Sequence, residues 1–221
     1  MWTLCRIMFW ILPIVGLVGA SNLSTAIIIL GIGVILIFVA SPKYAQFALM
    51  GIAGACFMGI FLALESYRLE RLAIWRNPEK YEKGYQTLQG LYAIGSGGVF
   101  GVGIGNSVQK LGFVPEAQND MIFSIICEEL GIFGGIFVLI LFGYLLYRLF
   151  FIAQNAPDLF GSLIVTGIFI HIALQVILNI AVVLNLMPNT GVTLPFISYG
   201  GTSIVFLMLE MAIALSVARQ I

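Results

Sequence analysis

The chain has 221 residues, of which 61% are hydrophobic and only 9% charged, and its formal net charge at neutral pH is zero. Soluble domains carry about 25% charged residues, so this composition excludes an ordinary globular protein. Without a basic excess there is no argument for nucleic acid as a partner. The three cysteines (Cys5, Cys56 and Cys127) are scattered in apolar surroundings without metal or redox spacing, which indicates small buried side chains.

Long apolar stretches predict an all-α fold, a polytopic membrane helix bundle, because a spanning helix needs about 20 apolar residues. The expected spans are Leu23–Ala40, Tyr44–Leu64, Asp120–Tyr147, Gly161–Leu186 and Phe196–Ala218. Met8–Ala20 is shorter, contains Pro13 and also resembles a signal peptide, but we interpret it as a further span. No internal repeat stands out, so residues 1–221 are interpreted as a single membrane domain of about five or six helices.

A large loop over residues 65–119 interrupts the expected spans. Leu64–Trp75 alternates apolar and charged residues in the pattern of a helix lying at a membrane interface, and Asn77-Pro78 ends it. Tyr85–Ile94 is a second short apolar stretch, which runs into the glycine-rich segment Gly95–Gly105. Such a segment either offers backbone amides to an anion or packs tightly against neighbouring helices, and the pattern alone leaves both readings open.

Polar residues recur at four-residue spacing in two of the expected helical regions. Glu116, Asp120, Ser124 and Glu128 would share one face if their segment is helical. Charged groups inside a bilayer cost about 3 kcal/mol or more each, so they usually face a protein interior or a water-filled cavity and indicate function.

The second set of polar residues is His171, Gln175 and Asn179, for which we favour hydrogen bonding between helices. Glu210 lies in the middle of the last expected span, where a carboxylate needs a partner or a raised pKa. Between these helices, the uncharged stretch 187–195 is rich in proline and glycine and predicts a rigid re-entrant turn.

The distribution of basic residues gives two opposed indications of orientation. Short tails and loops place four of them on one side, which the positive-inside rule assigns to the cytoplasm: Arg6, Lys43, Arg148 and Arg219. The long loop opposite carries six: Arg68, Arg71, Arg76, Lys80, Lys83 and Lys110. We give the short connections more weight, because long loops cross the membrane with less regard to charge.

Eight short motifs carry a resemblance to a known family. They are Tyr67–Arg71, Gly84–Gln86, Ala93–Gly98, Gly103–Ser107 with Gln109 and Lys110, Pro115–Ala117, Asp120–Phe123, Glu128–Gly131 and Leu194–Gly201. With them the sequence resembles the shape, elongation, division and sporulation (SEDS) family from about residue 23 to the C-terminus. The Gly-Asn-Ser-x-Gln-Lys form at residues 105–110 is more similar to the division member, FtsW, and to the sporulation member than to RodA.

The resemblance implies a glycosyltransferase that polymerises the peptidoglycan precursor lipid II during cell division. Members have about ten spans, and this sequence matches their C-terminal half, so we expect a truncated form that is inactive alone. Where relatives have Asp-Leu-Gly-Thr and His-Thr-Asp, this chain has Asn22–Thr25 and Gln118–Asp120, so an acid and an imidazole are replaced while Asp120 is kept. The family topology places the long loop outside the bacterial cell membrane and the C-terminus inside.

By the same resemblance, Asp120 is the expected catalytic residue, as the general base on the acceptor hydroxyl. Candidate substrate-binding residues are Arg68, Arg71, Gln86, Lys110, Glu116 and Ser198. Arg68, Arg71 and Lys110 would hold diphosphate, or would instead be ion-paired interfacial charges. No metal ligand is assigned, and the need for a divalent cation stays open.

Expected partners are lipid II, a class B penicillin-binding protein and other divisome membrane proteins. Two alternatives remain for the function. The chain would be a lipid II flippase, or a non-catalytic scaffold for a penicillin-binding transpeptidase.

Overall fold

The computed structural model describes residues 2–40, 48, 51–52, 54 and 66–221, and in these the regular secondary structure is entirely helical. The α-helices are α1 (Trp2–Ser21), α2 (Leu23–Ala40), α4 (Ser66–Arg76), α5 (Tyr85–Gly97), α6 (Ile122–Asn155), α7 (Leu159–Val183) and α8 (Gly201–Ala218). Three short 3₁₀ turns, η1 (Pro78–Lys80), η2 (Glu82–Gly84) and η3 (Gln109–Leu111), lie between them. The predicted all-α fold is confirmed.

Four of the described helices, α2, α6, α7 and α8, are long and apolar enough to cross a membrane. They correspond to four of the predicted spans, and the chain is a polytopic membrane helix bundle. α1 contains a shorter apolar stretch, Trp10–Ala20. The predicted span Tyr44–Leu64 falls largely outside the described residues, and the single domain with an external loop over 65–119 stays a prediction.

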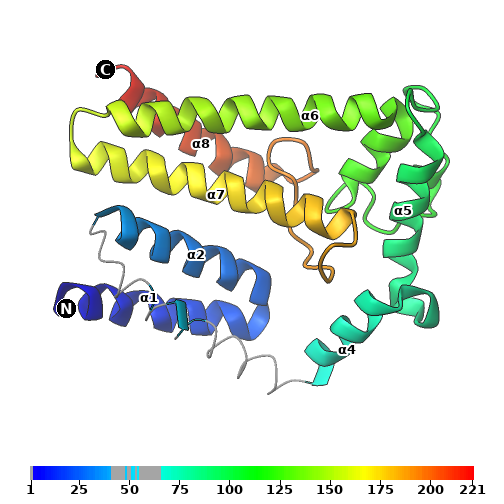
Figure 1. The fold of residues 1–221 in the computed structure, drawn as a ribbon, viewed down its shortest axis with the longest axis horizontal. Coiled ribbons are helices and arrows are strands. Elements are labelled where there is room, and N and C mark those ends of the chain that lie inside the picture. The colour runs from blue at the N-terminus through cyan, green and yellow to red at the C-terminus, as the bar shows by residue number, and fades with distance from the viewer. Residues whose placement is uncertain (1, 41–47, 49–50, 53, 55–65) are drawn as a thin grey trace.

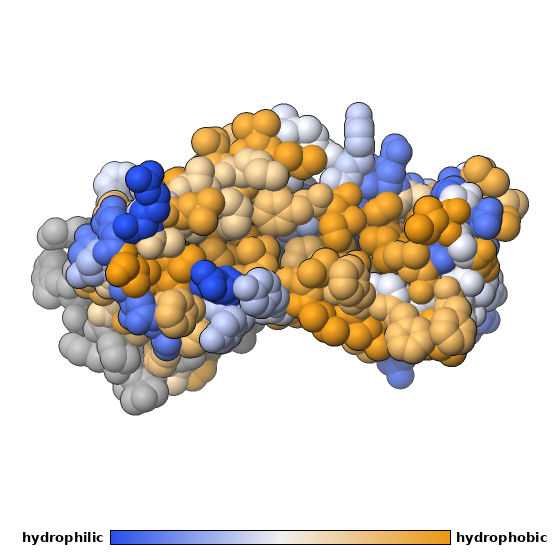
Figure 2. All heavy atoms as spheres, turned by 90° about the horizontal axis from the view of Figure 1, so that it is seen from above, coloured by the Kyte–Doolittle hydropathy of each residue, from blue (hydrophilic) through white to orange (hydrophobic). Residues whose placement is uncertain are grey.

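The helices form two neighbouring groups (Figure 1). α6 and α7 run side by side with α8 packed against them, while α1 pairs with α2, and α2 in turn contacts α7. Buried apolar side chains such as Val165, Ile172 and Leu207 fill the space between α6, α7 and α8. Figure 2 shows hydrophobic residues over much of the middle of one face, as expected of a surface that faces lipid.

The two ends of the bundle differ in what they carry. α4 and α5 lie at one end, whereas both termini and the turn between α6 and α7 lie at the other (Figure 1). α4 packs onto the segment before α8, where the Trp75 indole Nε1 donates a hydrogen bond to the Asn185 carbonyl at 3.0 Å. The predicted interfacial helix and the predicted short stretch from Tyr85 are thus both helical, as α4 and α5.

α6 is two helices joined at Gly131, where the backbone has φ 69° and ψ −166°. Thirty-four residues of unbroken helix would extend about 51 Å, well beyond the roughly 30 Å of a bilayer core. The segment from residue 132 to 155 is close in length to α7, its antiparallel neighbour. The break therefore leaves one segment long enough to cross a membrane and one short segment, Ile122–Leu130, which runs in a different direction.

The glycine-rich segment fills this break. The backbone N–H groups of Val102 and Gly103 donate to the carbonyls of Glu128 and Glu129 at 2.9 and 3.0 Å, and the Ile132 N–H donates to the Gly98 carbonyl at 3.0 Å. These bonds replace those that the interrupted helix loses, which a membrane protein requires.

Glycine is needed at these positions for space. A Cβ on Gly97 would lie 2.0 Å from the Cys127 carbonyl oxygen, and one on Gly101 would lie 2.1 Å from that of Glu129. Of the two readings of the glycine run, tight packing against a helix is therefore the one observed.

Candidate functional site

Asp120 lies in a turn just before α6, not on a helix face. α6 begins at Ile122, and Glu116 has a left-handed backbone with φ 54°. The predicted continuous stripe from Glu116 to Glu128 is therefore wrong, and only Ser124 and Glu128 are on the helix. The physical reason is that bonds from distant segments hold residues 118–120 in a turn.

The segment between α7 and α8 supplies most of these bonds. The Ser198 hydroxyl donates to the Asn119 carbonyl at 2.6 Å and accepts from the Leu194 N–H at 2.7 Å. The Tyr199 N–H donates to the Gln118 carbonyl at 2.8 Å. Ser198, predicted to bind substrate, is thus buried behind the turn and supports it.

Asn179 completes this support from α7. Its side-chain amide donates to the Asp120 carbonyl at 2.7 Å and to the Val192 carbonyl at 2.8 Å. The Asp120 backbone is therefore fixed from α7 while its carboxylate remains available to a different set of residues.

The Asp120 carboxylate faces a cleft of about 300 Å³. The charged and polar residues that line this cleft are Glu70, Arg71, Lys83, Gln86, Thr87, Asp120, Asn185, Asn189 and Thr190. Of the predicted site residues, the structure therefore brings together Arg71, Gln86 and Asp120. Lys83 and Asn189 were not predicted as site residues.

A chain of hydrogen bonds connects the cation to the acid across this cleft. Arg71 Nη1 donates to the Asn189 carbonyl at 3.1 Å, and the Asn189 side-chain amide donates to Gln86 Oε1 at 3.0 Å. Gln86 Nε2 then donates to Asp120 Oδ1 at 3.2 Å. Because α4, α5 and the segment before α8 each supply one member, the relative positions of Arg71 and Asp120 depend on all three.

Burial raises the pKa of the Asp120 carboxyl above its ordinary value, and the nearby charge of Glu116 raises it further. Hydrogen bonds from the backbone and from Gln86 and Asn189 act in the opposite direction without cancelling the rise. A carboxylate with a raised pKa is a better proton acceptor once ionised, which is the property a general base needs.

Two other predicted residues lie outside the cleft. Lys110 Nζ forms an ion pair with Glu129 Oε1 at 2.5 Å. Lys110 and Glu116 both line a separate hollow of about 600 Å³, together with Gln118 and several apolar residues. The side chain of Arg68 is not among those the structure describes, although its place on α4 is one turn from Arg71.

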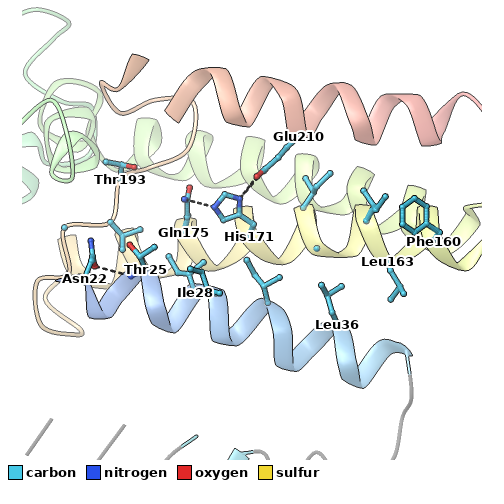
Figure 3. A pocket seen from close by; sticks show the side chains of 17 residues that line it. Asn22, Thr25, Ile28, Leu36, Phe160, Leu163, His171, Gln175, Thr193 and Glu210 are labelled. Carbon is cyan, nitrogen blue, oxygen red and sulfur yellow. Dashed lines mark hydrogen bonds and ion pairs between the residues drawn. The ribbon is translucent and has the colours of Figure 1, made fainter. Parts of the chain in front are cut away.

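The second polar set forms a contact between membrane helices. His171 Nδ1 on α7 lies 2.9 Å from Glu210 Oε1 on α8, and Gln175 Nε2 lies 2.9 Å from His171 Nε2. Figure 3 shows these side chains together in a groove of about 750 Å³ that α2, α7 and α8 border. The expected partner of Glu210 is therefore His171, and the favoured reading of His171 as a contact between helices is confirmed.

Metal ligands do not gather in the described part of the chain. No group of three or more His, Cys, Asp or Glu residues is close enough there to hold an ion. The divalent cation left open above therefore has no evident set of protein ligands in these residues, and its role stays untested.

Comparison with known proteins places the chain in a family. The model of the FtsW/RodA/SpoVE cell cycle proteins matches residues 2–221. The chain belongs to this family. Stage V sporulation protein E of Bacillus subtilis (strain 168) is 44% identical over 201 residues, an alignment covering 90% of this chain and 55% of that protein. A protein named probable peptidoglycan glycosyltransferase FtsW, from Thioalkalivibrio sulfidiphilus, is 38% identical over 204 residues and is covered to 51%.

Solved structures agree with this family membership. A chain of a peptidoglycan synthase complex, described as coordinating polymerization and crosslinking, superposes over 100% of this chain and 62% of its own length with a TM-score of 0.80 and 27% identity. The rod shape determining protein RodA of Thermus thermophilus superposes with a TM-score of 0.63 at 27% identity, over 97% of this chain and 56% of its own. The chain spans about half the length of the curated relatives it matches. The predicted SEDS resemblance is confirmed.

Proposed function

We propose that this chain carries the catalytic residues of a peptidoglycan glycosyltransferase that polymerises lipid II, with Asp120 as general base. The observation that carries the proposal is the Asp120 carboxylate, buried and yet facing a cleft that also contains Arg71. The names of the FtsW relatives supply the substrate class. The cleft supplies an acid and a cation, Asp120 and Arg71, that suit a sugar diphosphate substrate.

Glycan polymerisation joins the 4-hydroxyl of one lipid-linked sugar to the anomeric carbon of another. In the proposed step, Asp120 accepts the hydroxyl proton as the oxygen forms its bond to the anomeric carbon. The bond from that carbon to the diphosphate breaks, and the electron pair leaves with undecaprenyl diphosphate. A positioned base contributes about 10²–10⁴-fold in rate, and cations stabilise the charge that develops on the leaving group.

Among the predicted cations whose side chains the structure describes, Arg71 is the one that lines the cleft with Asp120. Its guanidinium donates to the Asn189 carbonyl at 3.1 Å, and its planar arrangement of N–H groups is suited to a phosphate. Arg68 is retained as a candidate because it precedes Arg71 by three residues on α4. Lys110 and Glu116 line another hollow, so their contact with substrate would have to be made there.

The proposed orientation places the Asp120 cleft outside the cytoplasm. Arg148 lies in the C-terminal part of α6, and Arg219 directly follows α8. Both of these helix ends lie at the end of the bundle opposite α4 and α5 (Figure 1). Basic residues in short connections favour the cytoplasmic side. Lipid II would then reach Asp120 from the outer leaflet of the cell membrane. A class B penicillin-binding protein would be the partner that crosslinks the product, and other membrane proteins of the division machinery would be further partners.

The test is a polymerisation assay with labelled lipid II. The chain is reconstituted in vesicles alone and together with the N-terminal half of the Bacillus subtilis sporulation relative, and products are separated by size. We expect glycan polymer from the paired halves. Movement of lipid II across the vesicle membrane without polymer would indicate a flippase. If the vesicles show no polymer and no movement of lipid II, but the protein still binds a penicillin-binding protein, the chain would be a scaffold.

Orientation is tested separately by thiol labelling in a cysteine-free background. Lys83→Cys should react with a membrane-impermeant reagent in intact cells, and Gln154→Cys should not. The reverse pattern would contradict the outer-leaflet chemistry.

A further inference from the structure

Lys83 is a second cation in the cleft of Asp120, and no motif singled it out. It lies in η2, directly before α5, and lines the cleft with Arg71 and Gln86. Its Nζ forms an ion pair with Glu70 Oε1 at 2.9 Å, and Glu70 lines the same cleft.

The backbone that carries Lys83 is held tightly. A Cβ on Gly84 would lie 2.1 Å from the Pro78 carbonyl oxygen, so the two turns η1 and η2 are in close contact at this point. The Gly84 N–H also donates to the Tyr81 carbonyl at 2.9 Å. The Lys83 side chain therefore extends from a fixed base, with its ammonium group at the mouth of the cleft.

The pairing of Lys83 with Glu70 is exposed to solvent. The two side chains are 69% and 42% exposed, and ion pairs of this kind contribute little to stability. Lys83 can therefore exchange Glu70 for another anion at little expense to the fold. A lysine that lines the cleft and can leave its ion-pair partner in this way is suited to binding an anionic ligand.

The segment before α8 completes the cleft with polar residues. Asn189 and Thr190 both line it, and the Asn189 carbonyl accepts from Arg71 Nη1 at 3.1 Å. The cleft therefore has uncharged polar residues as well as two cations. Arg71, Lys83 and Thr190 come from three separate segments, and they meet in one cleft with Asp120.

We propose that Lys83, together with Arg71, binds the diphosphate of the lipid-linked donor, and that Glu70 holds the Lys83 ammonium group until the donor enters. The inference rests on the proposed function for the identity of the lipid. In the reaction, the two cations accept the charge that the leaving diphosphate acquires, while Asp120 in the same cleft accepts the proton of the acceptor hydroxyl. Lys83 thus acts on the leaving group and not on the nucleophile.

The test measures binding of undecaprenyl diphosphate and undecaprenyl monophosphate to the full chain in lipid nanodiscs. Lys83→Gln is compared with Glu70→Gln and with the control Lys80→Gln, which removes an exposed lysine of η1 that does not line the cleft. Helical circular dichroism confirms that the four proteins are equally folded.

We expect Lys83→Gln to weaken diphosphate binding about tenfold or more, because a charge-assisted hydrogen bond is lost. The loss for the monophosphate should be smaller. Glu70→Gln should leave the affinity unchanged or increase it, since it frees the ammonium group. Lys80→Gln should stay within about twofold of the unmodified chain.

Equal affinities of Lys83→Gln and Lys80→Gln would overturn the proposal, as would an unmodified chain that does not bind the diphosphate. A loss in Glu70→Gln as large as that in Lys83→Gln would show that the ion pair serves the fold. The variants could change diphosphate binding as expected while the paired halves form no polymer. That combination would contradict the proposed function but still support the diphosphate site.

Discussion

Two buried carboxylates, Asp120 and Glu128, lie within eight residues of each other and have opposite surroundings. Glu128 is 2% exposed, and its carboxylate accepts hydrogen bonds from the Ser107 hydroxyl and from the Val108 N–H at 3.2 Å. Asp120 is 7% exposed, and its carboxylate accepts from the side-chain amide of Gln86 at 3.2 Å while it faces a cleft. Burial alone therefore does not distinguish an acid bonded into the packing from an acid that faces a cleft.

The difference lies in where the hydrogen-bond donors come from. Glu128 is bound by residues of the segment that fills the break in α6, so its charge fastens that segment to the helix. Asp120 is held through its backbone, by Asn179, which leaves carboxylate lone pairs toward the cleft. The main chain of Asp120 therefore carries its bond to α7, and its carboxylate faces the cleft.

The largest expected effect is that of Asp120→Asn on polymer formation. The amide keeps the size of the side chain but cannot accept the proton, so the rate should fall by about 10²–10⁴-fold. The measurement is the rate of glycan polymer formation by the paired halves, with Glu79→Gln as a control for loss of an exposed acid. A loss of less than about tenfold would remove Asp120 as the base.

Next in size is the effect of Gly131→Ala on stability. Gly131 has φ 69°, and a Cβ there would lie 2.4 Å from the Val99 carbonyl oxygen, so the variant should lose about 1–3 kcal/mol or more of folding free energy. Gly143→Ala is the control, because Gly143 is on the same helix with nothing within 4 Å of the added carbon. Unfolding of the purified proteins in denaturing detergent measures both. Equal midpoints would mean that the break at Gly131 is not needed for the fold.

Glu128→Ala should follow, with a loss of about 1–3 kcal/mol, because the buried Ser107 hydroxyl and the Val108 N–H lose their acceptor. The segment from 98 to 108 should also become more sensitive to protease. Ser124→Ala serves as the control, since it removes a buried side chain from the same helix whose hydroxyl bonds only to the neighbouring Met121 carbonyl. If the protease sensitivity of Glu128→Ala does not change, Glu128 does not hold this segment in place.

A smaller effect is expected from Gln86→Ala on the pH dependence of polymerisation. Gln86 donates to Asp120 and thereby lowers the pKa of its carboxyl, so removal of the amide should raise that pKa further. The base is active only when ionised, and the acid limb of the activity profile should therefore move to higher pH. At neutral pH the rate should fall by up to about tenfold. An acid limb that stays in place would show that Gln86 does not act through Asp120.

The smallest effect is the contribution of Asp120 itself to stability. Its folded pKa is raised above the ordinary value of 3.8, so the folded state binds the proton more tightly than the unfolded state. Stability from this group is present at low pH and is lost as pH rises through the folded pKa. Asp120→Asn should then gain stability relative to the unmodified chain as the pH rises above about 4. A difference in unfolding midpoint that does not change with pH would contradict the raised pKa.

The spans could be predicted closely, because apolar runs alone define them. The predicted span Leu23–Ala40 coincides with α2, and the first turn of α5 begins at the predicted Tyr85. α8 begins at Gly201, five residues after the predicted start of that span at Phe196. Phe196 has a left-handed backbone with φ 63°, because the turn it belongs to is bonded to residues 118 and 119.

The cleft could be predicted only in part, for the same physical reason. Asp120, Arg71 and Gln86 belong to motifs that resemble a family, whereas Asn189 contacts Gln86 across 103 positions of sequence and Lys83 reaches the cleft through a turn fixed by Pro78 and Gly84. Local periodicity carries no information on such contacts. It also extended a helix through the turn at Asp120, where long-range bonds override the four-residue spacing.

The central claim, that Asp120 serves chemistry and Glu128 serves the fold, is tested most directly by measuring polymer rate and unfolding midpoint on the same preparations of Asp120→Asn and Glu128→Ala. The account predicts that the two variants change rank between the assays. Asp120→Asn should lose nearly all polymer formation with an unchanged or higher midpoint, and Glu128→Ala should lose midpoint while the protein that remains folded still forms polymer. The same rank in both assays, with the less stable variant also the less active, would contradict the account.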